Sequence, residues 1–222
     1  MGAFWLSFGM VFLAELGDKS QLLALTLATK YKAWVTLAGI FTATFLIHLL
    51  SVALGGAVGE LLPTAWINFI AGLAFIGFGF WTLRGDSLDD DECNCQRRFA
   101  SPFMLVTATF FCGELGDKTM LSTVTLAANN PALPVWLGST LGMVLSDALA
   151  IMVGKLLGAR LPERAIQVGA ALIFFGFGLY GMYEGGADLS AGVWLVGVLA
   201  IALMATLYAR AIRRPQSQLS TE

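Results

Sequence analysis

Glu15-Leu16-Gly17-Asp18-Lys19-Ser20 stands in the middle of a long apolar stretch, and Glu114-Leu115-Gly116-Asp117-Lys118-Thr119 repeats it almost letter for letter. Both apolar stretches are long enough to cross a bilayer, which takes roughly 20 residues. Ionisable side chains at membrane depth are costly, so their presence indicates function. The doubled motif therefore indicates a membrane transporter.

The repeat extends far beyond the motif. A shift of 99 residues aligns residues 4–83 with residues 103–182 without a gap, and 27 of the 80 paired residues are identical. The chain is thus a duplicated unit. We expect four parts: repeat one over 1–84, an acidic cytoplasmic linker over 85–101, repeat two over 102–183, and a seventh span with a cytoplasmic tail over 184–222.

The composition is that of a protein surrounded by lipid, because 57% of the residues are hydrophobic and only 13% are charged. The predicted fold class is an all-α integral membrane protein with seven transmembrane helices, at about 3–28, 34–59, 65–83, 102–127, 133–158, 164–183 and 189–210. We expect the first span to remain in the mature protein, because no Lys or Arg precedes it and acids interrupt it.

Basic residues outside the motifs fall on one side of this arrangement. Setting aside Lys19 and Lys118 leaves 11 of the 13, and seven crossings place all of them on the same face: Lys30, Lys32, Arg84, Arg97, Arg98, Lys155, Arg160, Arg164, Arg210, Arg213 and Arg214. The positive-inside rule makes that face cytoplasmic. The N-terminus is therefore predicted to lie outside and the C-terminus inside.

Three spans per repeat is an odd number, so the two repeats are predicted to have inverted topology, with a seventh helix left over. Transporters of this construction bind substrate near the midplane, where the repeats meet, and alternate access by moving one half against the other. Glu15 and Glu114 lie near the centres of spans 1 and 4. Both acid motifs are thus expected at the same depth.

Side chains three and four residues apart share one face of a helix, so each motif is expected to form a cluster. The candidate cation ligands are the four motif acids, Glu15, Asp18, Glu114 and Asp117. Lys19 and Lys118 are expected to lower the net charge of the site and to tether an acid when no ion is bound. Glycine at 17 and 116 allows either close backbone approach or a loosened helix.

Further polar residues surround the two clusters. Ser20 and Thr119 are candidate auxiliary ligands, and so is Gln21, although its counterpart in the second repeat is Met120. Asp147 and His48 hold equivalent positions in spans 5 and 2, where they are candidates for a proton pathway. The alternative for both is a side chain satisfied by a neighbouring hydroxyl or carbonyl.

The charge of the site suggests ion exchange. Four carboxylates and two lysines sum to −2, which one divalent cation or two protons would neutralise, and buried carboxylates cannot all stay ionised without a counter-charge. Oxygen ligands favour Ca²⁺, Mn²⁺ or Mg²⁺ over Zn²⁺ or Cu⁺. A purely structural alternative is that each Glu-Lys pair merely fixes helix packing, but such a pair needs one acid and each motif contains two.

Glu-x-Gly-Asp-Lys-Ser/Thr, present twice in two similar three-helix halves, resembles the motif of the Gdt-type cation/proton exchangers. This family includes Golgi manganese and calcium transporters and MneA-type bacterial manganese exporters. The resemblance covers residues 4–183 and implies Mn²⁺ or Ca²⁺ exchanged for H⁺, with the motif acids binding the ion. In a bacterium-like chain it implies Mn²⁺ export across the inner (plasma) membrane.

The expected partners are divalent metal ions, protons and the bilayer, with no cofactor and no nucleic acid; the oligomeric state is open. Three alternatives remain: a Ca²⁺/H⁺ antiporter, an intramembrane acid-dependent hydrolase, and an exporter of small solutes. The segment from Asp86 to Arg98, which contains Cys93 and Cys95, could capture metal, although such charged runs are usually solvated linkers.

Overall fold

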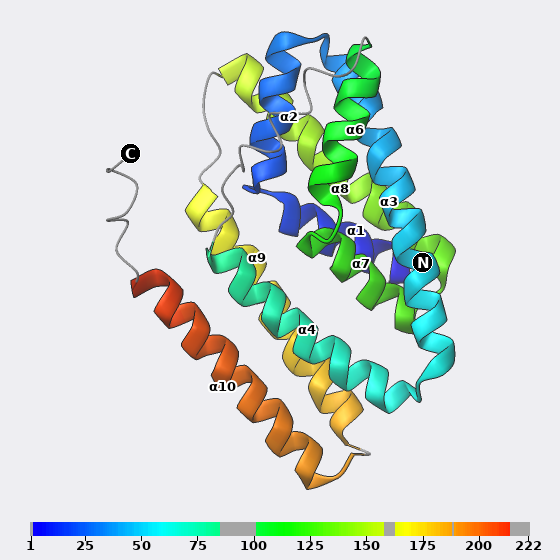
Figure 1. Cartoon of the computed structure of the whole chain (residues 1–222), viewed down its shortest axis with the longest axis vertical. Helices are drawn as coiled ribbons and strands as arrows, with labels where there is room; N and C mark the ends of the chain where they lie inside the picture. The colour runs from blue at the N-terminus through cyan, green and yellow to red at the C-terminus, as the bar shows by residue number, and fades with distance from the viewer. Residues whose placement is uncertain (1, 85–100, 158–162, 188, 214–222) are drawn as a thin grey trace.

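The computed structural model describes residues 2–84, 101–157, 163–187 and 189–213, where every regular element is a helix (Figure 1). The first repeat contains α1 (Gly2–Glu15), α2 (Lys19–Lys30), α3 (Ala33–Leu61) and α4 (Thr64–Arg84). The second contains α6 (Pro102–Glu114), α7 (Lys118–Asn129), α8 (Ala132–Leu157) and α9 (Glu163–Gly186), and α10 (Ala191–Arg213) follows. The linker from Asp86 to Arg98, with Cys93 and Cys95, lies outside the described residues.

Five of these helices are long and apolar enough to cross a bilayer: α3, α4, α8, α9 and α10. This confirms an all-helical chain of membrane-protein character. The other four helices have only 12 to 14 residues each, whereas a single span takes roughly 20. None of the four could cross a bilayer alone.

The short helices come in two pairs, and each pair occupies one predicted span. The sequence predicts single spans over 3–28 and 102–127, but α1 ends at Glu15 before α2 begins, and α6 ends at Glu114 before α7 begins. Gly17 and Gly116 have φ angles of 77° and 80°, a left-handed conformation that interrupts a helix and strongly favours glycine. The seven predicted spans therefore correspond to five continuous helices and two interrupted ones.

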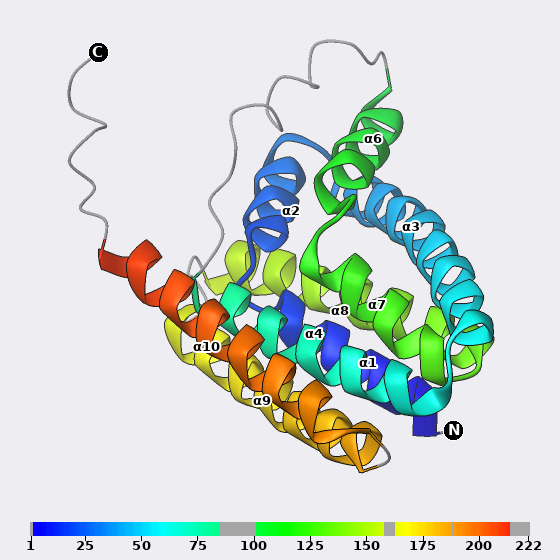
Figure 2. The same cartoon turned by 60° about the horizontal axis from the view of Figure 1, so that its bottom comes forward.

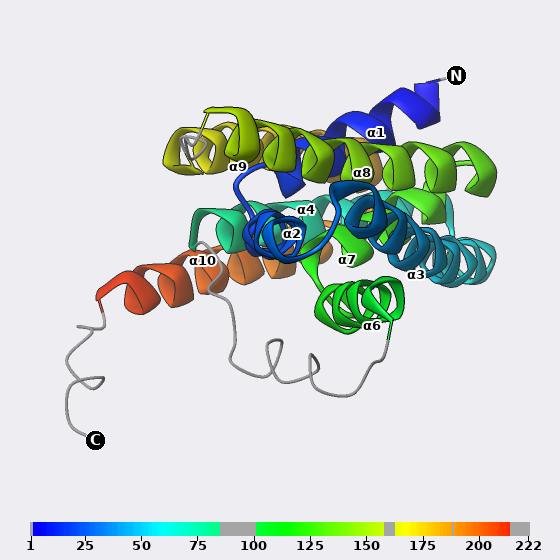
Figure 3. The same ribbon diagram turned by 90° about the horizontal axis from the view of Figure 1, so that it is seen from above.

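Helices of one repeat pack mainly against helices of the other. α1 lies along α8, and its counterpart α6 lies against α3, while α4 and α9 pack against each other (Figure 3). α7 packs on α3, and its counterpart α2 packs on α8. Because each of these contacts has its equivalent in the other repeat, the core is a pseudo-symmetric interface between the repeats.

Glycines show that equivalent contacts are not equally close. A Cβ atom added at Gly138 in α8 would meet the backbone oxygen of Phe4 in α1. At the equivalent Gly39 in α3, the nearest atom would belong to the side chain of Val106 in α6. The nearest atom belongs to the backbone in the first pair and to a side chain in the second, where the Phe103 backbone oxygen follows at 3.3 Å.

The other interrupted pair repeats this difference. A Cβ atom at Gly55 in α3 would meet the backbone oxygen of Val124 in α7, whereas one at Gly154 in α8 would meet the side chain of Leu25 in α2. Thus these glycines meet backbone first in α1 and α7 and a side chain first in α2 and α6. α2 and α6 also lie at the same end of the molecule, at the top of Figure 1.

α10 stands at the edge of the molecule, beside α4 (Figure 2). Only 6% of its most apolar 18-residue stretch is buried against the rest of the molecule. Aromatic pairs join the two helices near both ends, with ring centroids 5.5 Å apart for Phe69 and Trp194 and 5.6 Å apart for Phe80 and Tyr208. Most of the apolar surface of α10 is therefore available to lipid.

Candidate cation site

Both motifs lie at the breaks between short helices. Glu15 is the last residue of α1, and Asp18 is the N-cap residue of α2. The backbone N–H of Asp18 donates to the backbone carbonyl oxygen of Glu15 at 3.1 Å. In the second repeat the backbone N–H of Asp117 donates to the backbone carbonyl oxygen of Glu114 at 3.2 Å. Each acid pair therefore brackets a turn beside a helix N-terminus, whose partial positive charge favours anions.

The motif side chains are withdrawn from the molecular surface. Glu15, Asp18, Glu114 and Asp117 are all 5% exposed or less. Lys118 is equally buried, at 3%, whereas Lys19 is half-buried. Five buried ionisable groups must be balanced by one another or by an added ion, because isolated buried charges are very costly.

A buried ion pair joins the two motifs directly. The Lys118 ammonium lies 2.6 Å from Asp18 Oδ1, and both side chains are nearly inaccessible to solvent. The pair connects residues 100 positions apart, one from each repeat. It therefore brings the interrupted spans together, as the repeat architecture predicts for a shared site.

Hydroxyl groups bind the glutamates of their own motifs. Ser20 Oγ donates to Glu15 Oε1, and Thr119 Oγ1 donates to Glu114 Oε2 at 3.0 Å. Both hydroxyls are buried. Their position beside the acids is compatible with the auxiliary ligand role expected of them.

Asp147 belongs to the same group of charges. It is fully buried in α8, and it interacts electrostatically with Asp18, Glu15 and Glu114. Within the described residues, neither Asp147 carboxylate oxygen has a hydrogen-bond partner, and neither does Glu15 Oε2. Unpartnered buried carboxylate oxygens require an explanation, and an exchangeable proton or cation is the simplest.

The carboxylates do not form a ready-made coordination shell. In the part of the chain that the structure describes, no three His, Cys, Asp or Glu side chains converge closely enough to hold a metal ion. Asp18 is instead engaged by Lys118. The site has the charge and the oxygen atoms that a divalent cation needs, but ligation requires side chains to rearrange.

His48 differs from its counterpart Asp147. It is buried in α3, and its Nδ1 lies 3.4 Å from Thr140 Oγ1 of α8. No interaction of His48 with a motif acid is present among the described contacts. The two candidates for a proton pathway thus have different surroundings.

Gln21 ties the first break to α8. Its Oε1 accepts from the Gly17 N–H at 2.8 Å, and its Nε2 donates to Ser146 at 3.0 Å (backbone oxygen) and 2.8 Å (Oγ). In the second repeat, the Gly116 N–H meets Met120 Sδ at 3.2 Å. Gln21 therefore holds the break in repeat one, and its Oε1 keeps a second lone pair for the expected ligand role.

Two residues near the site had no role in the sequence prediction. Ser146 accepts a hydrogen bond from Gln21 Nε2. Gln167 of α9 donates from Nε2 to the backbone oxygen of Gly17 at 3.4 Å. The position of Ser146 next to Asp147 was the only signal for the first. Nothing in the sequence pattern indicates Gln167, because its contact depends on how α9 packs beside the break.

Comparison with known proteins identifies relatives along most of the chain. The model of the family described as "Divalent cation/proton antiporter GDT1" matches residues 3–90 and again residues 102–189. The two matches are offset by 99 residues, the same shift that aligns the repeats. The family model thus corresponds to one repeat and occurs twice.

Individual relatives agree with this match. A "Putative manganese exporter" of Vibrio cholerae serotype O1 is 34% identical over 177 residues, covering 78% of this chain and 87% of that protein. "GDT1-like protein 5" of Arabidopsis thaliana is 31% identical over 209 residues, covering 78% and 92%. "GDT1-like protein 5" of Oryza sativa is 30% identical over 223 residues, covering 83% and 96%. No solved structure matches.

Proposed function

Since the chain belongs to the GDT1 family of divalent cation/proton antiporters, we propose that it exports Mn²⁺ from the cytoplasm in exchange for H⁺, at a site made by its two motifs. Family membership makes the protein a membrane transporter, which excludes the hydrolase alternative. The direction of transport, the ion and the residues involved are the proposal.

The cross-repeat ion pair is the observation that carries this proposal. In the empty protein, Lys118 supplies the positive charge that buried Asp18 needs. A divalent cation that enters the site replaces this charge, after which Asp18 can turn to the ion together with Glu15 and Glu114. Lysine cannot ligate a metal while protonated, so the ammonium must leave Asp18 as the ion binds.

Protons compete with the ion for the same oxygens. The four motif acids and two lysines carry −2 when all are ionised, and one divalent cation or two protons neutralise them. Asp147 brings the count to −3, so one further proton is needed when the cation is bound. We assign one of the two exchanged protons to Asp147, whose carboxylate oxygens have no hydrogen-bond partner among the described residues.

The nature of the donors supports a hard divalent cation. The motifs offer carboxylate and hydroxyl oxygens, which suit Mn²⁺, Ca²⁺ and Mg²⁺ rather than Zn²⁺ or Cu⁺. Among these ions Mn²⁺ is favoured because a relative covering 78% of the chain is named a manganese exporter. Exchange of Ca²⁺ for H⁺ remains the second candidate, since calcium prefers the same oxygens.

Inverted repeats and alternating access complete the proposal. The equivalent breaks at Gly17 and Gly116 and the exchanged contacts of α1 with α8 and α6 with α3 support it. In this arrangement the chain crosses the bacterial inner membrane seven times. Its N-terminus lies outside, and the helix ends that carry the basic residues lie in the cytoplasm.

A polar cavity lies at the opposite end from the basic residues. It has a volume of about 360 Å³, and its lining includes Asn68, Asn129, Asn130 and Glu184. These residues come from the ends of α4, α7 and α9 that the proposed topology places outside. Amide and carboxylate oxygens there would give a released cation its first ligands outside the membrane core.

Proton flux in liposomes tests the proposal. Purified protein would be reconstituted with a pH-sensitive dye inside, and Mn²⁺, Ca²⁺ or Mg²⁺ would be added in turn. We expect Mn²⁺-dependent proton flux that saturates and that falls at least about tenfold in Glu15→Gln and Glu114→Gln, because losing one ionised ligand costs more than about 1.4 kcal/mol. Full flux in both variants would overturn the assignment, and flux with Ca²⁺ alone would favour the second candidate.

A further inference from the structure

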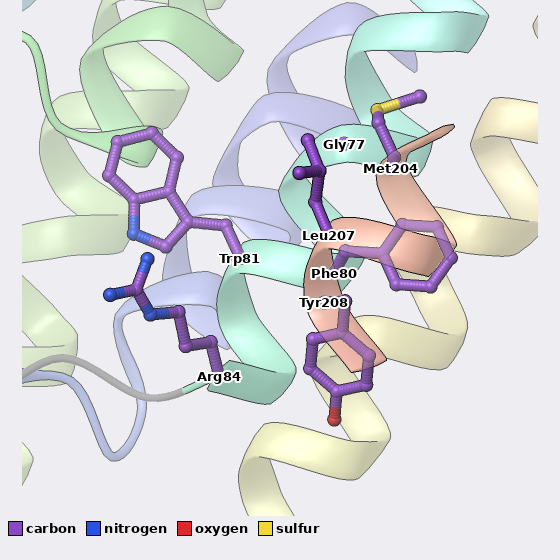
Figure 4. A pocket seen from close by; sticks show the side chains of 7 residues that line it. All are labelled: Gly77, Phe80, Trp81, Arg84, Met204, Leu207 and Tyr208. Atoms are coloured by element: carbon purple, nitrogen blue, oxygen red, sulfur yellow. The ribbon is translucent and has the colours of Figure 1, made fainter. Parts of the chain in front are cut away.

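A second cavity, of about 400 Å³, is a groove between α4 and α10 (Figure 4). No motif residue lines it. Its lining is almost wholly apolar: Gly77, Phe80 and Trp81 come from α4, and Met204, Leu207 and Tyr208 come from α10. The groove falls in the size range of small-molecule sites. α10 leaves most of its own surface to lipid, so lipid can reach the groove directly.

The shape of the groove depends on a small residue. A Cβ atom at Gly77 would lie 3.3 Å from Met204 Sδ, so any larger side chain there would intrude on the space between the helices. Phe80 closes one side by packing its ring against Tyr208, with centroids 5.6 Å apart. Apolar side chains of both helices line the space that remains.

The mouth of the groove is positively charged. Arg84 is the last residue of α4 and is exposed, and Figure 4 shows its side chain reaching beside the indole of Trp81. No ion pair engages Arg84 among the described residues. Arg210, also exposed, lies two residues beyond Tyr208 at the same end of α10. An apolar groove whose lining includes exposed Arg84 is complementary to an anionic amphiphile.

We propose that this groove binds an anionic phospholipid of the cytoplasmic leaflet, with an acyl chain between α4 and α10 and the phosphate on Arg84. Basic pockets between helices at the cytoplasmic face recognise such head groups, and the Tyr208 hydroxyl is a further donor at the same depth. A zwitterionic lipid would bring its own cation to this mouth and bind less well. The proposal rests on the orientation of the helices and is independent of the ion chemistry at the motifs.

Native mass spectrometry of the full-length protein tests this proposal. The protein would be released from bilayers made of equal amounts of phosphatidylglycerol and phosphatidylcholine, and the retained lipids counted. We expect wild type to keep one phosphatidylglycerol in preference to phosphatidylcholine. Arg84→Gln should abolish the preference, because the phosphate loses its charged partner, and Gly77→Leu should abolish retention, because the groove is filled.

Lys32→Gln is the matched control, since it removes an exposed basic residue of the same face, distant from the groove; its lipid retention should equal that of wild type. Arg84→Gln alters an exposed helix end, so it remains decisive if Gly77→Leu fails to fold. Equal retention of both lipids by wild type would overturn the proposal. So would an Arg84→Gln protein that keeps its phosphatidylglycerol, or a wild type that retains no lipid.

Discussion

Lys118 and Lys19 hold equivalent positions in the two motifs, yet Lys118 is 3% exposed while Lys19 is half-buried. Burial makes the Lys118–Asp18 pair sensitive to the loss of either partner, because a lone charge would then remain in the interior. Because buried Asp18 needs a positive partner, a bound cation could take the place of Lys118 beside it. Lys118 is thus the residue whose replacement best separates an exchange site from a structural ion pair.

Lys118→Met should lower the free energy of unfolding by about 3–5 kcal/mol, because Asp18 is left buried without its partner. Saturating Mn²⁺ should restore much of this loss, since an ion that binds only the folded protein stabilises it. Thermal unfolding of the purified protein with and without Mn²⁺ measures both effects.

Lys19→Met provides the internal control. Its more exposed position is closer to solvent, so the loss of stability should be smaller, because charges near water interact more weakly. A Lys118→Met protein that is destabilised but gains nothing from Mn²⁺ would mean that the ion pair is structural only.

Asp147→Asn and His48→Gln distinguish the two proton-pathway candidates. Asparagine has nearly the shape of aspartate, and the Asp147 oxygens accept no hydrogen bond that the change would break. We expect proton-coupled Mn²⁺ flux to fall at least about tenfold in Asp147→Asn, with the half-saturating Mn²⁺ concentration close to wild type. His48→Gln should retain most flux, because His48 faces Thr140 rather than the motif acids. The reverse ranking in liposome flux assays would contradict this assignment.

The sequence names the candidate site residues, but it could not predict how they pair. Duplication and depth single out the motif acids, because few charges lie within the apolar stretches. That Lys118 selects Asp18 of the other repeat depends on how α1, α2 and α7 meet in space. The bonds from Gln21 to Ser146 also connect distant segments, and no local pattern encodes such a contact.

Interrupted helices are the main element-scale difference from the sequence prediction. Apolar residues continue on both sides of the motif through residues 3–28, and a glycine within such a span does not by itself decide between a continuous helix and a turn. The structure resolves this through Gly17 and Gly116, both with positive φ. The five uninterrupted spans were predictable because length and hydropathy alone specify them.

Gly116→Ala should lower the free energy of unfolding by about 1–2 kcal/mol, the cost of a left-handed conformation for a residue with a Cβ atom. The cost is conformational, because a Cβ atom at Gly116 would meet nothing within 4 Å. Gly56→Ala is the matched control in the interior of α3, also with nothing within 4 Å, and it should stabilise by about 0.5–1 kcal/mol. If both changes stabilise the protein in thermal unfolding, the turn at Gly116 is not part of the stable fold.

At the scale of the whole molecule, inverted topology makes a prediction about equivalent positions. Lys32 and Pro131 correspond in the two repeats, and both are exposed. Inverted repeats place Pro131 outside and Lys32 in the cytoplasm. Two positions that would share a face in a parallel duplication must therefore lie on opposite faces here.

Single cysteines at these positions test the topology in a variant lacking Cys93, Cys95 and Cys112. A maleimide that cannot cross membranes should label Pro131→Cys in intact cells and Lys32→Cys only after permeabilisation. Labelling of both positions in intact cells, or of neither, would rule out the inverted arrangement. The result does not depend on any assumption about the transported ion.

Unequal glycine contacts make the two faces of this carrier inequivalent. Backbone atoms lie nearest to the glycines where α1 meets α8 and where α7 meets α3, while side chains lie nearest where α2 and α6 pack. Helices α2 and α6 lie at the end that the proposed topology places in the cytoplasm. If side-chain contacts yield more easily than backbone contacts, the proposed alternating access should rest, without cargo, in the orientation that faces the cell interior. Half-saturation constants measured from the two sides should differ, although the ratio of the gradients at equilibrium stays fixed by the stoichiometry of exchange.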